Sequence, residues 1–181
     1  MAPRLLVDAC VLYPQLLRAL VVGAAGEGLI AAFWSPRVIE EWRLAAARRG
    51  GMEAEAAMRA AEADLARRFP DAMVAPDPGG EAALALPDAA DVHVVAAAVA
   101  ARADVLTANL RDFPARRLAP YGVGVRHPDG LLWALFSEAP DRLGPVIADA
   151  LAALADEGEG GGRRALKRAG LPRLGKAWAG G

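Results

Sequence analysis

Several acidic residues of this chain stand where a fold could bring their carboxylates together. The candidates are Asp8, Glu40 or Glu41, Asp88, Asp91 and Asp112. Converging carboxylates repel one another unless a cation lies between them. Oxygen ligands with no thiolate and little imidazole select Mg²⁺ or Mn²⁺. Such an ion lowers the pKa of a bound water and offsets charge that develops on a phosphodiester. The acids therefore indicate metal-dependent hydrolysis of phosphodiesters.

Two of these acids open the segment 86–113, around which the chain is organised. Asp88 and Asp91 lie three residues apart, at the start of an Ala/Val-rich run without Gly or Pro as far as Leu110. Such a run predicts a helix at its beginning. Both acids also have a purely structural interpretation, Asp88 as the helix N-cap and Asp91 as a capping-box residue favoured by the helix dipole.

The same segment next predicts a buried strand, because residues 104–107 are apolar and rich in β-formers. Asn109 and Asp112 follow just past its carboxyl end, and Asp8 has the equivalent place after the first predicted strand. Ligands of open parallel α/β sheets bind at that edge. The simpler alternatives are that Asp8 starts a turn and that Asp112 caps the turn at Pro114.

The remaining elements complete an α/β pattern with a parallel sheet. Helices are predicted over residues 12–23, 36–49, 52–69, 114–121, 128–136 and 137–155, and strands over 4–7, 30–34, 72–75 and 122–126. Ser35-Pro36 is an N-cap with Pro at N1, and Gly50-Gly51 breaks the helix that it starts. The expected division is a domain over 1–139 and a helical extension over 140–181, with a Gly-rich hinge at 157–162.

Charge is divided unevenly along the chain. Its 181 residues suit one domain, and 55% hydrophobic residues are ample for a core. From Gly160 onward there are six basic residues and no acids, which leaves 15 basic and 22 acidic residues before it, a net charge of −7. The six are Arg163, Arg164, Lys167, Arg168, Arg173 and Lys176. An acidic body thus carries a basic tail.

The single Cys10 excludes an intramolecular disulfide and, with only two His, argues against a structural zinc site. We interpret Cys10 as a small core residue without a base to activate it, and His93 as an ordinary packed histidine. No segment has the length of a signal peptide or a membrane span, so a cytoplasmic location is expected.

Four blocks of the sequence resemble the PIN-domain family. They are VDACVLYP (7–14), SPRVIEEW (35–42), LPDAADVHVVAAAVAARADVLTANLRDFP (86–114) and YGVGVRHPDGLL (121–132). More narrowly, they are similar to the VapC-like toxin ribonucleases of type II toxin–antitoxin pairs. This resemblance implies a three-layer α/β/α sandwich with a central parallel sheet, and Mg²⁺- or Mn²⁺-dependent cleavage of RNA. It also implies an antitoxin partner that blocks the site and, usually, a homodimer.

The family's catalytic, metal-binding acids match four positions of this sequence. Asp8 matches the first, and Glu41 the second, because that acid directly precedes the apolar residue that Trp42 provides here. Asp91 matches the third in D-x-x-V-x-A-A, and Asp112 the acid of N-x-x-D-F. The supporting residues expected around them are Asp88, Thr107 and Asn109, and the expected substrate contacts are Arg111, Arg116 and Arg117.

This chain departs from the family pattern at two positions. Cys10 stands where Asn, Ser or Thr is usual, which removes a polar group that orients the first acid. Asn109 stands where many relatives have a further Asp, and its amide brings no charge to a second metal.

Other functions would use the same residues. A non-catalytic binding module could keep the fold, and a nuclease acting on DNA or a phosphatase could use the same acids. The basic tail either guides RNA, docks an acidic part of the antitoxin, or only packs Leu166, Leu171 and Trp178 on the body.

Overall fold

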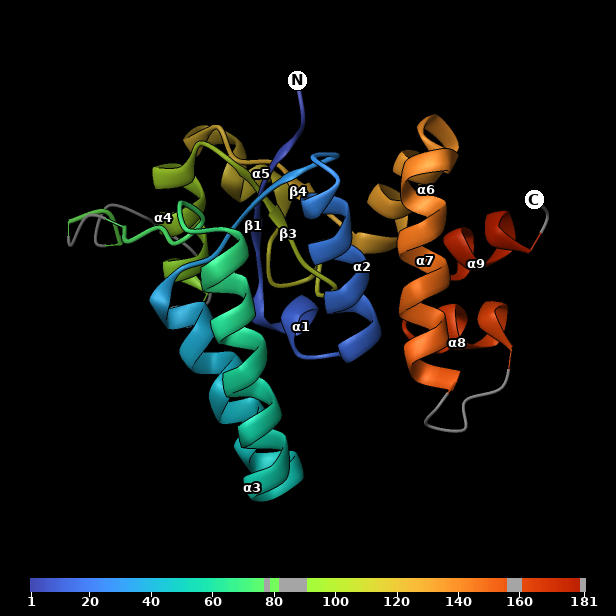
Figure 1. The fold of residues 1–181 in the computed structure, drawn as a ribbon. Coiled ribbons are helices and arrows are strands. Elements are labelled where there is room, and N and C mark those ends of the chain that lie inside the picture. Colours follow the sequence, from blue (N-terminus) through green and yellow to red (C-terminus); the bar gives the residue numbers. More distant parts are fainter. Residues whose placement is uncertain (77–78, 82–90, 156–160, 180–181) are drawn as a thin grey trace.

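A computed structural model describes residues 1–76, 79–81, 91–155 and 161–179 (Figure 1). Its centre is a four-stranded parallel sheet of order β2-β1-β3-β4. The strands are β1 (Arg4–Val7), β2 (Ala31–Phe33), β3 (Asp104–Leu106) and β4 (Val125–Arg126). The predicted α/β class with a parallel sheet is confirmed. The strand predicted at 72–75 is wrong, because in that stretch only an isolated parallel bridge joins Met73 to Trp34.

Helices cover both faces of the sheet (Figure 1). They are α1 (Ala9–Leu12), α2 (Gln15–Gly26), α3 (Pro36–Arg68), α4 (Val92–Ala101), α5 (Ala115–Leu118), the 3₁₀ helix η1 (Ala119–Tyr121), α6 (Pro128–Glu138), α7 (Pro140–Ala155), α8 (Gly162–Arg168) and α9 (Pro172–Trp178). The chain moves one way from β1 to β2 and the other way from β2 to β3. Right-handed crossovers therefore place α2 and α4 on opposite faces, which gives the three layers.

The first predicted helix, 12–23, is wrong in its bounds. The structure has two helices there, because Pro14 adopts an extended conformation (φ −70°, ψ 123°) and its ring lacks the N–H that a continuous helix needs. α1 therefore ends at Leu12, and α2 begins only at Gln15.

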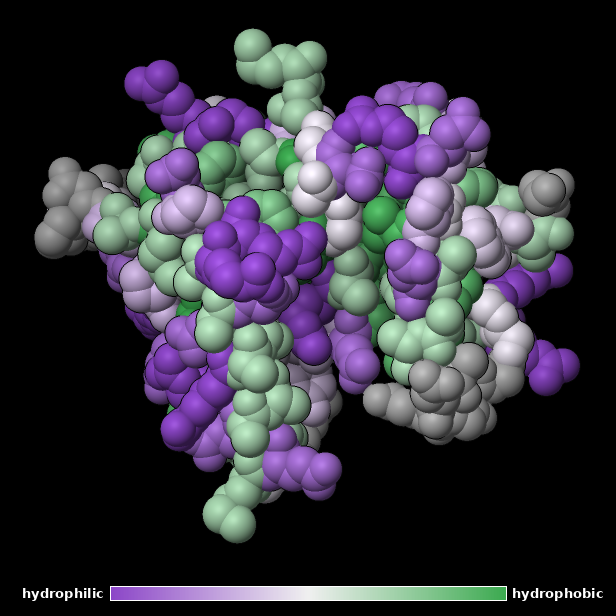
Figure 2. All heavy atoms as spheres, in the orientation of Figure 1, coloured by the Kyte–Doolittle hydropathy of each residue, from purple (hydrophilic) through white to green (hydrophobic). Residues whose placement is uncertain are grey.

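α3 forms an arm that projects from the body. Ser35 caps it by accepting a hydrogen bond from the Val38 N–H at 3.2 Å. Gly51 interrupts the helix with φ 61°, a conformation that favours glycine, and the two halves lie side by side (Figure 1). An ion pair of 3.2 Å between Arg43 and Glu62 joins the halves. Figure 2 shows the arm as a pale hydrophobic strip flanked by hydrophilic side chains. The predicted break at Gly50-Gly51 is confirmed.

The core lies between the sheet and the helices. Leu5, Leu6 and Val7 of β1 are fully buried, and α4 is buried through most of its length. Such a helix suits its Ala/Val sequence, which offers no polar face. Within the described ranges, every helix is too short or too polar to cross a bilayer.

The C-terminal helices pack on the body. α7 lies so close to α2 that a Cβ on Gly23 would come within 2.3 Å of Val146 Cγ1. Leu166 and Leu171 are buried, and the half-buried Trp178 makes an edge contact with Phe136, with 5.8 Å between ring centroids. The tail therefore does pack its apolar side chains. Of the predicted hinge, 157–160 lies outside the described residues, and α8 already begins at Gly162.

Candidate active site

The carboxyl edge of the sheet brings Asp8 and Thr107 together. Val7 of β1 pairs with Leu106 of β3, so the next residues of the two strands are neighbours. The Asp8 N–H donates to the Leu106 carbonyl at 3.0 Å. The chain leaves β1 toward β2 on one side, while β3 lies on the other, which makes this the topological switch point of the sheet.

One oxygen of the Asp8 carboxylate is held by two side chains. The Thr107 hydroxyl donates to Oδ2 at 2.7 Å, and the Cys10 thiol donates to the same atom at 2.9 Å. Thr107 is fully buried and in turn accepts the Asn109 N–H at 3.0 Å. Both donors reach Oδ2, so among the described residues nothing donates to Oδ1 of the half-buried Asp8. The carboxylate is oriented and keeps one oxygen for a ligand.

Cys10 is therefore more than the small core residue that the sequence suggested. Burial, followed by the charge of Asp8, raises the pKa of the thiol from 9.0 to about 12. The protonated thiol can donate where relatives use a hydroxyl or amide, so the expected loss of a group that orients Asp8 is also wrong. The Ala108 N–H donates back to the sulfur at 3.3 Å. Only the position of Cys10, two residues after Asp8, could have indicated this role.

The loop after β3 links Asn109 to Asp112. The Asn109 side-chain amide donates to Asp112 Oδ2, and both residues are exposed. Phe113, which follows Asp112, is buried and fixes the end of the loop in the core. A hydrogen-bonded series thus runs from Asp8 through Thr107 and Asn109 to Asp112. The three predicted substrate contacts, Arg111, Arg116 and Arg117, are all exposed.

Glu41 and Glu40 have different surroundings. Glu41 contacts α4, where its Oε1 lies 2.8 Å from Nε2 of His93. Glu40 is exposed and pairs with Arg43 one turn along α3. The His93 side chain is 2% exposed, and its Nδ1 has no partner among the described residues. His93 is therefore buried against a predicted catalytic acid, a role that its sequence position, two residues after Asp91, did not reveal.

The start of α4 differs from the prediction. The helix begins at Val92 with Asp91 in the N-cap position, where its side chain makes no capping hydrogen bond. Asp91 is half-buried. Asp88, the expected N-cap, lies outside the described residues.

The oxygen atoms of the predicted acids are of the kind that binds a hard divalent cation. Their positions do not form a complete metal site among the described residues. Carboxylate and amide oxygens are the ligands that Mg²⁺ and Mn²⁺ select. Among the described residues, however, no three His, Cys, Asp or Glu side chains lie close enough together to hold one ion. The structure thus pairs Asp8 with Thr107, Asp112 with Asn109, and Glu41 with His93.

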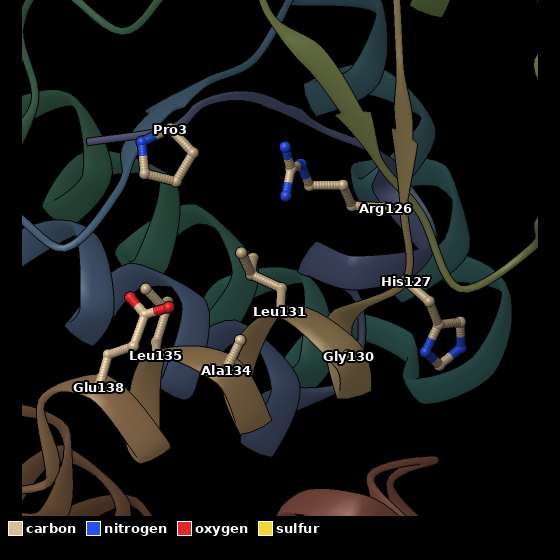
Figure 3. A pocket seen from close by; sticks show the side chains of 8 residues that line it. All are labelled: Pro3, Arg126, His127, Gly130, Leu131, Ala134, Leu135 and Glu138. Atoms are coloured by element: carbon tan, nitrogen blue, oxygen red, sulfur yellow. The ribbon is translucent and has the colours of Figure 1, made fainter. Parts of the chain in front are cut away.

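A separate pocket of about 330 Å³ lies between the start of the chain, the end of β4 and α6 (Figure 3). Leu131, Ala134 and Leu135 of α6 form its apolar wall. Its arginine, Arg126, is already paired with Asp104 at 2.8 Å. None of the predicted catalytic acids lines this pocket.

Comparison with protein families finds a match to this chain. A family model described as a PIN domain matches residues 4–111, more than half of the chain. The match includes three of the four predicted catalytic acids and ends one residue before Asp112. Comparison with curated proteins gave no match, and neither did comparison with solved structures.

Proposed function

The chain belongs to the PIN-domain family, and from this membership we propose that it is a metal-dependent endoribonuclease, the toxin of a type II toxin–antitoxin pair. PIN domains are generally nucleases that use divalent metal ions. The observation that carries the proposal is Asp8, an oriented and partly open carboxylate at the topological switch point of the sheet.

In this proposal Asp8, Glu41, Asp91 and Asp112 hold Mg²⁺ or Mn²⁺. The ion, when bound, supplies an activated water and offsets charge on the scissile phosphate. The other residues position the acids. Thr107 and Cys10 hold one oxygen of Asp8, His93 holds Glu41, and Asn109 holds Asp112. Such partners orient metal ligands.

Positive charge for RNA comes from the loop after β3 and from α5. The acids of the site repel a polyanion, so an enzyme of this kind needs cations nearby. The exposed arginines Arg111, Arg116 and Arg117 follow β3 in the chain, and we expect them to contact phosphates. Asp88, three residues before Asp91 in the sequence, is the further supporting acid of this proposal.

The enzyme proposal is tested by cleavage of a total-RNA pool. We expect Mg²⁺-dependent cuts that EDTA prevents, and no cuts in single-stranded DNA of matched sequence. Mapping the 5′ ends of the fragments gives the cleavage sequence. Cleavage that persists undiminished in EDTA contradicts the metal-dependent mechanism, and preferential cleavage of DNA contradicts the assignment to RNA.

The toxin proposal requires a partner that blocks the site. The resemblance of the four sequence blocks to VapC-like toxins supports it, and the cytoplasm is where such a toxin meets RNA. We expect production of the chain alone to arrest growth, and coproduction of the small protein encoded beside it to restore growth and to copurify. A homodimer is expected from size-exclusion chromatography with light scattering. Normal growth with an active chain would contradict the toxin role.

A further inference from the structure

A second pocket lies directly beside Asp8, between the start of α2 and the α3 arm. It has a volume of about 450 Å³ and is lined by Ala9, Cys10, Tyr13, Pro14, Ala45 and Arg48. We call it the α1–α3 pocket. Cys10 both lines it and donates to Asp8, so a single residue separates the pocket from the carboxylate.

The α3 wall of the pocket belongs to the same helix face as Glu41. Ala45 lies four residues after Glu41, and Arg48 lies three further on, so the three side chains follow one stripe of the helix. The pocket therefore lies beside Asp8, which accepts a hydrogen bond from its lining residue Cys10, and along the face of α3 that carries Glu41. A ligand bound there lies next to the reacting group rather than at a remote surface.

A neighbouring pocket of about 360 Å³ shares the lining residues Tyr13 and Pro14 with it. Arg18 lines this neighbouring pocket, and its guanidinium lies 5.0 Å from the ring centre of the buried Trp42. Among the residues that the structure describes, the charged side chains that line the two pockets are those of Arg18 and Arg48, although residues 1–159 carry a net charge of −7. This local reversal of charge favours a polyanion over an acidic or neutral apolar ligand.

We propose that the α1–α3 pocket holds an unpaired nucleobase of the RNA next to the scissile phosphate. The proposal rests on the proposed ribonuclease function and adds its specificity-determining subsite. Tyr13 offers an aromatic surface for stacking, Arg48 contacts the backbone phosphate, and the small Ala45 leaves the space that the base fills. Unpaired bases are recognised by such stacking, and a pocket of this volume suits a small aromatic ligand.

Filling the pocket tests the proposal. Ala45→Phe places a ring in it, whereas Ala47→Phe adds the same ring to an exposed position about 200° around the helix. Binding is measured by fluorescence anisotropy with a labelled single-stranded RNA pool, in an Asp8→Asn background that prevents cleavage. We expect Ala45→Phe to weaken binding about 5- to 150-fold, the contribution of stacking one base. Ala47→Phe should remain within about 2-fold, the scatter expected of a surface change.

Two further substitutions test the proposal even if Ala45→Phe does not fold. Tyr13→Leu should weaken binding over the same range. Arg48→Gln should lower the slope of log K against log salt by about 0.7, the effect of one phosphate contact with a single strand. Arg59→Gln, at an exposed arginine in the second half of α3, is its control and should leave the slope unchanged. In a chain that keeps Asp8 and can therefore cleave, Ala45→Phe should also change the sequence at which the RNA is cut.

The outcomes separate the subsite from the function. If the unaltered chain cleaves RNA and Ala45→Phe behaves like Ala47→Phe in both binding and cut-site sequence, the pocket does not hold a base and the ribonuclease proposal stands. If Ala45→Phe abolishes only copurification of the neighbouring protein, the pocket binds the antitoxin instead. If the unaltered chain neither binds nor cleaves RNA, both proposals fail together.

Discussion

Asp8 and Asp129 are two carboxylates in very different surroundings. Asp129 is 5% exposed, and the backbone N–H groups of Arg173 and Leu174 donate to it at 3.0 to 3.2 Å, which ties α9 to α6. Asp8 is half-buried and receives two side-chain donors on one oxygen. Backbone N–H groups donate to both oxygens of Asp129. The two side-chain donors to Asp8 both reach Oδ2, which orients the carboxylate and leaves Oδ1 for a ligand. The difference distinguishes an acid that holds the fold together from one that is available to a ligand.

Asp8→Asn should have the largest effect on activity. The amide keeps the size of the side chain but removes the charge that a cation needs, so cleavage should fall by more than about 100-fold, beyond the 10- to 100-fold typical of losing a supporting partner. The midpoint of thermal unfolding should change little. If Asp8→Asn retained activity, Asp8 would not be a catalytic residue.

Glu41→Gln and Glu40→Gln form a matched pair on α3. Glu41 contacts the buried His93, and Glu40 is exposed beside Arg43. We expect Glu41→Gln to lower kcat about 100-fold, the upper end of the range for residues at a metal site, and Glu40→Gln to have no measurable effect. The opposite result would show that the second acid is Glu40.

Asp129→Ala should affect stability instead. It leaves two backbone N–H groups at the start of α9 without their acceptor, and unfolding in urea should show a loss of about 2–3 kcal/mol. Cleavage per folded molecule should be unchanged, because Asp129 lies on α6 and not at the sheet edge. A loss of specific activity at temperatures where the variant is folded would show that Asp129, like Asp8, is needed for cleavage.

Thr107→Val separates orientation from ligation. Valine has nearly the same shape but cannot donate to Asp8 or accept the Asn109 N–H. We expect cleavage to fall about 10-fold, the lower end of the effect of losing a supporting partner, and Thr107→Ser to restore it. Equal activity in the two variants would mean that the hydroxyl does not position Asp8.

Cys10 gives the smallest effect. Cys10→Ser keeps a donor to Asp8 and should retain cleavage within a few-fold, whereas Cys10→Ala should be the weaker of the two. Because the pKa of the thiol is raised to about 12, little thiolate is present at pH 8, and alkylation by iodoacetamide should be about 100- to 1,000-fold slower in the folded chain than in urea. Equal alkylation rates would show that the thiol is not held as described.

The sheet and its edge could be predicted because their signals are local. The apolar runs at residues 4–7 and 104–107 predicted β1 and β3, and the acids after them followed from the edge rule. The contacts between elements could not be predicted. Cys10 and Thr107 meet only through the register of β1 with β3, and His93 meets Glu41 only through packing of α4 against α3.

Three other features also depended on tertiary structure. Asp129 has no sequence feature that marks it as the acceptor for α9, because its donors lie more than 40 residues away in the chain. The strand expected at 72–75 failed because that segment meets the sheet only at Trp34. α4 begins at Val92, and the side chain of its N-cap residue Asp91 makes no capping hydrogen bond, so capping residues in the sequence were not enough to predict where this helix starts.

Cation binding tests most directly whether the acids of the sheet edge form a metal site. Mn²⁺ is titrated by calorimetry and by electron paramagnetic resonance into the unaltered chain, Asp8→Asn and Asp129→Asn, all below their unfolding temperatures. We predict that the unaltered chain and Asp129→Asn bind Mn²⁺ equally and that Asp8→Asn loses at least about 10-fold in affinity. Equal binding by all three proteins would contradict a metal site at Asp8.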